Sequence, residues 1–172
     1  MNEPRDQSLN DALYYAGGLL WEWGILEASL NWAIAELRKG NPKAAARPPA
    51  DFDIRFGKRI KEWRSLIASL HGVGSDQLKF ADELIGQIGE AVNHRHNIAH
   101  GILGALERPE RPTAIVCTVD HYRQTLGGFA PIYEDYDVDR LVSECERARH
   151  LANLLKLATY GKVERKKREK RR

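Results

Sequence analysis

Residues 95–100 combine side chains that suit phosphate chemistry. The segment reads Arg95-His96-Asn97-Ile98-Ala99-His100, and Asn93 lies just before it. Arg stays charged and binds phosphate as a planar fork, whereas His gives or takes a proton near neutral pH. On a helix that turns about 100° per residue, Asn93, His96 and His100 share one edge, and the long stem of Arg95 lets its head reach round to them. These residue types at this spacing indicate phosphodiester chemistry.

Gly101 follows His100 directly and suits the left-handed position at which many helices end. If the helix stops there, His100 lies beside the negative end of the helix dipole, which favours the imidazolium form. We therefore expect His100 to act as a general acid.

Two other interpretations of these residues stay open. His and Arg at a helix end can cap carbonyl groups and bond to the following segment without any catalysis. His96 and His100 also have the i,i+4 spacing of zinc ligands, but no Cys or carboxylate lies nearby at ligand spacing. We expect no metal and no cofactor.

Apolar residues that recur at steps of three and four predict four helices. The first covers about residues 8–38, and Gly40 follows its end. The second ends near His71-Gly72, with Asp51 or Asp53 as its capping residue. The apolar stripe of the first helix consists of Leu19, Trp23, Leu26, Leu30, Ala33 and Leu37, and that of the second of Phe56, Ile60, Trp63, Ile67 and Leu70.

The third helix starts at the capping residue Ser75 and carries the chain into the Arg95–His100 segment. The last one starts at Asp137 or Asp139. The third stripe is Leu78, Ala81, Ile85, Ile88 and Val92, and the last is Val138, Leu141, Cys145, Ala148, Leu151 or Ala152, and Leu155.

Between these two helices the pattern changes to β-prone runs over residues 102–106 and 113–119. A turn-rich stretch separates the runs, which predicts an antiparallel hairpin, with residues 121–126 as a candidate third strand. We expect a loop over residues 127–135.

Arg, a polar residue, three further residues and His form a pattern that resembles the signature of HEPN domains, in which a Gly like Gly101 often follows. The run Ile25-Leu26-Glu27-Ala28-Ser29-Leu30-Asn31, the run Phe56-Gly57-Lys58-Arg59-Ile60 and a closing helix after an inserted hairpin agree with it. The resemblance covers about residues 10 to 158. It implies a mainly α fold, a bundle of about four helices with a small antiparallel β-hairpin inserted before the last helix.

The resemblance also implies a function, namely metal-independent endoribonuclease activity in defence, toxin or stress-response systems. Two copies of the motif would face one cleft in a homodimer, with Arg95 on phosphate and His100 as acid or base. His96 occupies the family's variable polar position, and Asn93 and Asn97 are supporting candidates only. The alternative is a non-catalytic module that binds RNA or protein. An antitoxin or effector is a further possible partner, but Ile102 stands where toxins paired with nucleotidyltransferase antitoxins carry Tyr.

The charge is distributed unevenly along the 172 residues. The net charge is +3, yet residues 162–172 contain eight Lys or Arg and two Glu, so the remaining chain carries −3. We expect a disordered N-terminus over residues 1–7, one domain over residues 8–160, and a basic tail over residues 161–172. The nucleic-acid contacts predicted in that tail are Arg165, Lys166, Lys167 and Arg168.

Residues 1–10 lack the pattern of a secretory signal, and acidic residues interrupt the longest apolar stretch, so we expect a cytoplasmic protein without a membrane span. Cys117 and Cys145 match no metal or redox spacing and are expected to be buried. Of the aromatic residues, Trp23 and Trp63 lie on predicted core stripes. The less constrained Tyr14, Tyr15 and Trp21 could instead cover a dimer surface.

Overall fold

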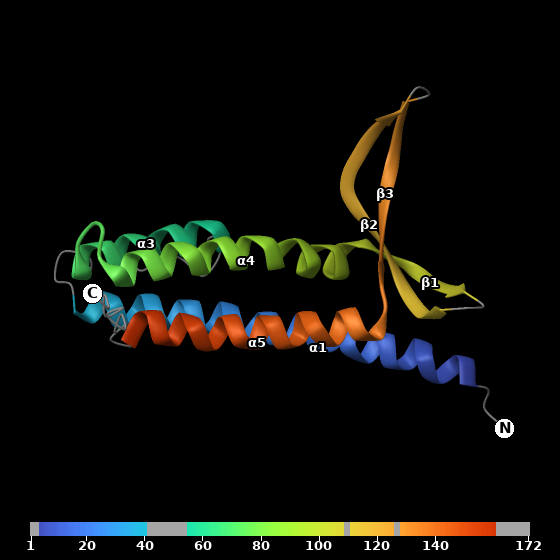
Figure 1. The fold of residues 1–172 in the computed structure, drawn as a ribbon, viewed down its shortest axis with the longest axis horizontal. Coiled ribbons are helices and arrows are strands. Elements are labelled where there is room, and N and C mark those ends of the chain that lie inside the picture. The colour runs from blue at the N-terminus through green and yellow to red at the C-terminus, as the bar shows by residue number, and fades with distance from the viewer. Residues whose placement is uncertain (1–3, 41–54, 109–110, 126–127, 161–172) are drawn as a thin grey trace, which may run out of the picture. The chain divides into compact units, whose positions relative to one another are not determined.

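The fold is mainly helical. The computed structural model describes the backbone of residues 4–40, 55–108, 111–125 and 128–160, and the side chains of residues 9–40, 55–100 and 134–160. The helices are α1 (Pro4–Lys39), α3 (Phe56–His71), α4 (Asp76–Gly101) and α5 (Val138–Tyr160), shown in Figure 1. Three strands, β1 (Ile102–Arg108), β2 (Arg111–Thr125) and β3 (Gly128–Tyr136), lie between α4 and α5 in the sequence.

The chain divides into two compact units. The first combines Met1–Ile25 with Ile88–His150, and the second combines Leu26–Gln87 with Leu151–Arg172. Helices α1, α4 and α5 therefore contribute one part to each unit, α3 belongs to the second, and all three strands belong to the first. The single domain expected over residues 8–160 stays a prediction.

Two predicted caps are present at helix starts. The Ser75 hydroxyl accepts a hydrogen bond from the Leu78 amide at 3.2 Å before α4, and the Asp137 carboxylate accepts one from the Arg140 amide at 2.8 Å before α5. Such side-chain caps are worth about 1 kcal/mol each. Helix α3 differs, because its N-cap residue is Arg55, whose side chain makes no capping bond. The predicted caps Asp51 and Asp53 lie outside the described residues.

The predicted apolar stripes form most of the core. All six residues of the α1 stripe are buried, as are Ile60, Trp63 and Ile67 of α3. Each large apolar side chain that is fully buried contributes about 1.5–3 kcal/mol. Leu70 is a wrong prediction, because it lies in the last turn of α3 and is 43% exposed. In α4, Leu78, Ala81 and Ile88 are buried as predicted, whereas Leu84 and Ala91 are buried in place of Ile85 and Val92.

Polar contacts join the helices of the second unit. Arg59 of α3 donates to Asn31 of α1 at 2.8 Å and to Glu27 at 2.7 Å. The Trp63 indole donates to the Thr159 hydroxyl of α5 at 3.2 Å. Trp63 is fully buried, so α3 packs against both α1 and α5 in this helical unit.

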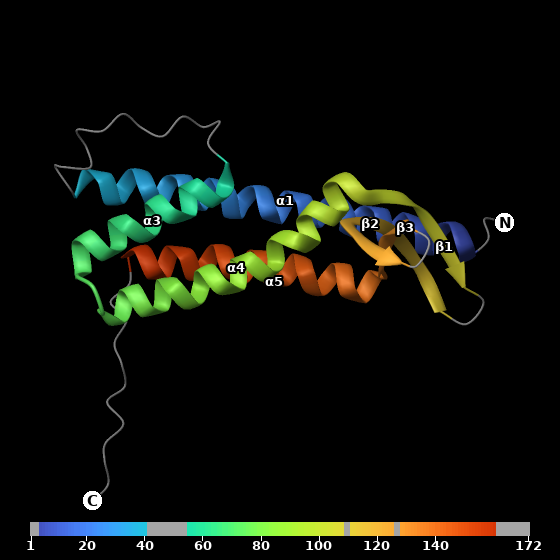
Figure 2. The same ribbon diagram turned by 90° about the horizontal axis from the view of Figure 1, so that it is seen from above.

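The first unit carries an antiparallel sheet in the order β1-β2-β3. Ile102 pairs with Cys117 in the first pair of strands, and Ile115 pairs with Tyr136 in the second. The loop expected over residues 127–135 is wrong, because residues 128–136 pair with β2 along their length. The chain thus passes from α4 into β1 and returns from β3 through Asp137 into α5 (Figure 2).

Candidate functional site

The last two turns of α4 carry the Arg95–His100 segment. The helix ends at Gly101, as predicted, with His100 as the basic residue of its last turn. His96 and His100 are exposed, and their ring centroids lie 4.9 Å apart with the ring planes tilted by 57°. Two imidazoles one helical turn apart therefore share a surface that solvent can reach.

Arg95 lies next to this histidine pair in the chain and is half-buried. Among the described side chains it has no hydrogen bond or ion pair, so its guanidinium is not neutralised by a neighbouring carboxylate there. Asn93, like His96 and His100, is exposed. A permanently charged guanidinium and two exposed imidazoles are thus close together in the sequence.

The opposite side of the same two turns faces the protein interior. Asn97 is only 4% exposed and donates from its side-chain amide to the Tyr136 hydroxyl at 3.0 Å. His94, which sequence reasoning did not single out, places its Nδ1 2.9 Å from the same hydroxyl oxygen. Tyr136 itself is fully buried at the end of β3. Asn97 therefore fastens α4 to β3.

The hydrogen-bond network continues from Tyr136 to acidic and basic side chains. The Tyr136 hydroxyl donates to Glu134 Oε2 at 2.9 Å, and Arg140 donates to the same oxygen at 2.8 Å. The Arg140 guanidinium also lies 4.1 Å from the centroid of the Tyr136 ring, in the geometry of a cation–π contact. The network thus ends at the start of α5, where Arg140 contacts both Glu134 and the Tyr136 ring.

His94 contacts both Tyr136 and Arg140. The Tyr136 hydroxyl donates its single hydrogen to Glu134 and accepts a hydrogen bond from the Asn97 amide. His94 places its Nδ1 2.9 Å from this hydroxyl oxygen and 3.5 Å from a terminal nitrogen of Arg140. Its Nε2 lies 3.6 Å from Glu144 Oε1 on α5. His94 connects α4 to both β3 and α5.

Burial raises the pKa of Tyr136 well above its ordinary value of 10, and the Glu134 carboxylate adds to the increase. The Asn97 amide and the Arg140 charge act in the opposite direction but do not cancel it. The hydroxyl therefore stays protonated at physiological pH, which its hydrogen bond to Glu134 requires.

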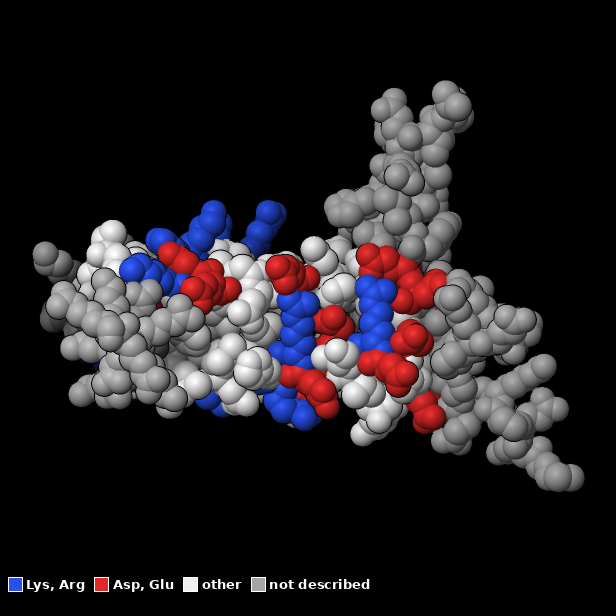
Figure 3. All heavy atoms as spheres, in the orientation of Figure 1, with Lys and Arg blue, Asp and Glu red and all other residues white. Residues whose placement is uncertain are grey.

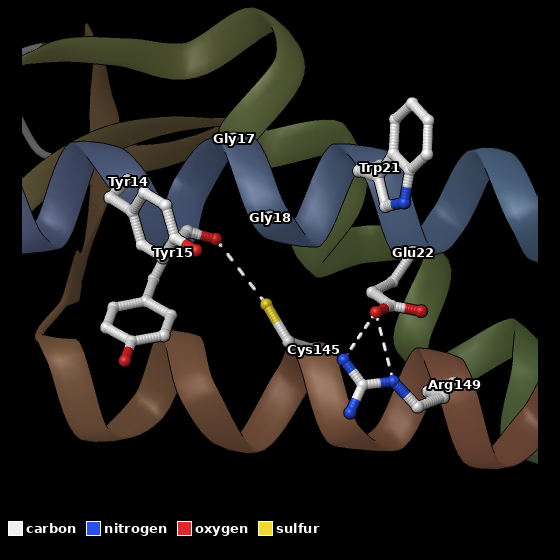
Figure 4. Close-up of a pocket in the computed structure, with 8 residues that line it drawn as sticks. All are labelled: Tyr14, Tyr15, Gly17, Gly18, Trp21, Glu22, Cys145 and Arg149. Carbon is white, nitrogen blue, oxygen red and sulfur yellow. Dashed lines mark hydrogen bonds and ion pairs between the residues drawn. The ribbon is translucent and has the colours of Figure 1, made fainter.

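A pocket of about 400 Å³ lies between α1 and α5 in the first unit (Figure 4). Tyr14 and Trp21, which the sequence left less constrained, are 74% and 72% exposed at its edge. Cys145 is buried as predicted and donates its thiol to the Tyr15 carbonyl at 3.5 Å. The side chain of Cys117 lies outside the described residues. The pocket lining consists of Tyr14, Tyr15, Gly17, Gly18, Trp21, Glu22, Cys145 and Arg149.

Charges of both signs are interspersed on the face shown in Figure 3 and do not form a single basic surface there. The basic residues predicted to contact nucleic acid, namely Arg165, Lys166, Lys167 and Arg168, lie outside the described residues.

Within the described part of the chain, no group of three or more His, Cys, Asp or Glu residues could hold a metal ion. None of the described helices is long and apolar enough to cross a membrane.

Comparison with known proteins adds no relative: the sequence matches no protein-family model and no curated protein, and the fold matches no solved structure. The site thus rests on its own geometry. That geometry adds His94, Tyr136 and Arg140 to the residues singled out from the sequence. Their shared contacts join positions up to 46 residues apart, which helical periodicity does not reveal.

Proposed function

We propose that this chain is a metal-independent endoribonuclease of the HEPN type, with its working site on the outer side of the last two turns of α4. The observation that carries the proposal is the contact between the exposed rings of His96 and His100 next to Arg95. Their spacing matches the HEPN signature, and their exposure leaves them accessible to a phosphodiester.

The proposed reaction uses the nucleophile of the substrate. The 2′-hydroxyl loses its proton to His96 in its neutral form, and its oxygen attacks the neighbouring phosphorus. The bond from phosphorus to the 5′-oxygen breaks, and His100 in its imidazolium form gives this leaving oxygen a proton. Arg95 stabilises the negative charge that builds on the phosphate oxygens. The products are a 2′,3′-cyclic phosphate and a free 5′-hydroxyl.

His94 and Asn97 support this site from the other side of the helix in our proposal. Both contact the buried Tyr136, so they hold the last two turns of α4 at a fixed rotation about the helix axis. A fixed rotation keeps Arg95, His96 and His100 on one outer surface, as catalysis by positioned groups requires.

A homodimer is part of the proposal, because one copy supplies a single Arg and two histidines, and a two-fold interface brings the same patch of both subunits together. The hairpin before α5 belongs to the same HEPN-like architecture. In such a protein the basic tail of residues 161–172 contributes affinity for RNA without reading its sequence. Cleavage of RNA in defence, toxin or stress-response systems is the role that we propose, with an antitoxin or effector as a regulating partner.

A cleavage assay with generic single-stranded RNA tests the proposal. Purified protein should cut RNA with a chelator present, and the Arg95→Ala/His100→Ala double variant should not. If the wild type never cuts RNA, but binds RNA or a protein partner in a way that the double variant loses, the chain is instead a binding module that uses the same surface. A double variant that keeps full cleavage activity would refute the proposed site.

A further inference from the structure

The part of α1 that belongs to the first unit has an exposed side without charged residues. Between positions 13 and 25 every exposed residue is aliphatic, aromatic or glycine. At about 100° per residue, these positions lie within a sector of about 140°. Figure 4 shows Trp21, one of them, pointing away from α5. This surface, called the α1 stripe below, consists of Leu13, Tyr14, Gly17, Leu20, Trp21, Gly24 and Ile25.

The other two helices of the same unit expose different residue types. On α5, every exposed residue from position 138 to 150 is polar or charged. On α4, every exposed residue from position 88 to 100 is polar, charged or glycine. A helix that is apolar on all sides is normally buried, and a contiguous exposed apolar surface marks an interaction site. The α1 stripe is therefore a candidate docking surface.

Two glycines of the α1 stripe are not required by packing within the chain. A Cβ added to Gly17 or to Gly24 would meet no atom within 4 Å. Glycine is also the poorest helix former after proline, so neither position favours the helix itself. A residue without a side chain does allow a group from another molecule to approach the backbone closely. Gly17 and Gly24 thus provide two shallow holes, one on each side of Trp21 along the helix.

The order of large and small residues makes the α1 stripe complementary to itself. Trp21 and Gly17 both lie two residues from Leu19, in opposite directions along the chain. Tyr14 and Gly24 both lie five residues from it. In a two-fold antiparallel pair of α1 helices centred at Leu19, each ring is therefore at the level of a glycine of the other copy. A parallel pair would instead bring ring against ring and glycine against glycine.

The exposed area of the α1 stripe suits a contact between two copies. Tyr14 and Trp21 are 74% and 72% exposed, so together they leave roughly 300 Å² of aromatic surface in solvent. A two-fold contact buries this surface twice, which supplies about half of the roughly 1,200 Å² at which stable interfaces begin. Leu13, Leu20 and Ile25, each 38–48% exposed, add aliphatic surface around the rings.

We propose that the α1 stripe binds the α1 stripe of a second copy of this chain, with the two helices antiparallel and the two-fold axis at Leu19. Trp21 of each copy packs over Gly17 of the partner subunit, and Tyr14 packs over Gly24 of the partner subunit. The stripe contains no residue of the Arg95–His100 segment, so the proposal does not rest on RNA cleavage.

Sedimentation velocity of the full-length protein at tens of micromolar tests the contact. The wild type should sediment as a dimer, and Trp21→Glu should raise the dissociation constant of the dimer at least about 30-fold, because it removes a central aromatic anchor. The matched control Trp32→Glu removes another exposed indole of α1 that lies outside the stripe, and it should leave the dissociation constant unchanged. A monomeric wild type, or equal effects of the two variants, would overturn the proposal.

An exchange of ring and glycine tests the antiparallel register. Gly17→Trp adds a ring where the chain itself has open space, so the variant should fold, as circular dichroism can verify. That ring meets Trp21 of the partner subunit, so the dissociation constant should rise at least about tenfold. The double variant Gly17→Trp/Trp21→Gly again places each ring over a glycine, and it should recover most of the wild-type affinity. A double variant that dimerises no better than Gly17→Trp would overturn the proposal.

Discussion

The outer and inner sides of the last two turns of α4 differ sharply, although both carry histidine and amide side chains. On the outer side, His96 and His100 contact each other and are exposed. On the inner side, His94 and Asn97 both contact the buried hydroxyl of Tyr136. Residue type alone does not distinguish the two sides. Burial and long-range contacts do, and they predict loss of activity for outer substitutions and loss of stability for inner ones.

The largest effect is expected on the outer side. His100→Ala should lower the rate of RNA cleavage about 10²- to 10⁴-fold, because it removes the proposed general acid. Arg95→Ala should lower it about 10²- to 10³-fold by removing stabilisation of the phosphate charge. For the exposed His100, the free energy of unfolding should change by no more than about 0.5 kcal/mol. Single-turnover cleavage and urea denaturation measure the two quantities.

His150→Ala is the matched control, because His150 is an exposed histidine on α5 outside the motif. Its cleavage rate and stability should both equal those of the wild type. If His100→Ala instead unfolds the protein, the outer side has a structural role and the contrast between the two sides is wrong.

The next largest effect is expected on the inner side. Tyr136→Phe keeps the ring but removes the hydroxyl that contacts His94, Asn97 and Glu134. The buried Asn97 amide would then lack its partner, so the variant should lose about 1–3 kcal/mol of stability. Thermal denaturation measures this destabilisation. An unchanged melting temperature would show that this network does not hold α4.

A smaller effect is expected on the pH dependence of the free energy of unfolding. The pKa of Tyr136 is higher in the folded protein than its ordinary value of 10, so above pH 10 the unfolded chain loses this proton first. The stability that Tyr136 contributes is therefore fully present below pH 10 and falls as the pH rises towards the pKa of the folded state. Urea denaturation at about pH 8 and about pH 11 should show a larger decrease for the wild type than for Tyr136→Phe. Equal decreases would contradict the assignment.

The smallest effect is expected from removal of residues 162–172, which belong to neither side of α4. This tail carries a net charge of +6 and almost no apolar residues, so the melting temperature should stay the same. The slope of log affinity for RNA against log salt should become shallower by about 0.7 for each phosphate that the tail neutralises in the full-length protein. A slope that does not change would mean that the tail neutralises no phosphate.

The sequence predicted the elements that rest on local patterns. The buried stripes of α1 and α5, the caps Ser75 and Asp137, and the end of α4 at Gly101 agree with the structure because periodicity and cap chemistry act over a few residues. Predictions failed where tertiary contacts decide. Leu70 continues the stripe of α3 but is exposed, and the segment predicted as a loop forms β3, which pairs with the preceding strand β2 through partners 3 to 21 residues apart.

The candidate site likewise contains residues that local patterns predict and residues that only tertiary contacts reveal. Arg95, His96 and His100 follow from residue types and spacing, whereas the role of His94 follows only from Tyr136, which lies 42 residues later. The sequence indicated only that Tyr14, Tyr15 and Trp21 are less constrained than the core aromatic residues, and it did not predict the pocket that they line. Its ion pair requires both helices, because Arg149 of α5 pairs with Glu22 of α1 across 127 residues. No short-range pattern encodes such a pairing.

Analysis of the RNA ends formed in the presence of a chelator tests the central claim most directly. We predict that wild-type protein cuts RNA without added metal, leaves 2′,3′-cyclic phosphate ends, and does not cut DNA, which lacks the 2′-hydroxyl. The Arg95→Ala/His100→Ala double variant should fold normally and form no such ends. Cleavage that requires a metal ion, that proceeds equally on DNA, or that persists in the double variant would contradict the proposed mechanism.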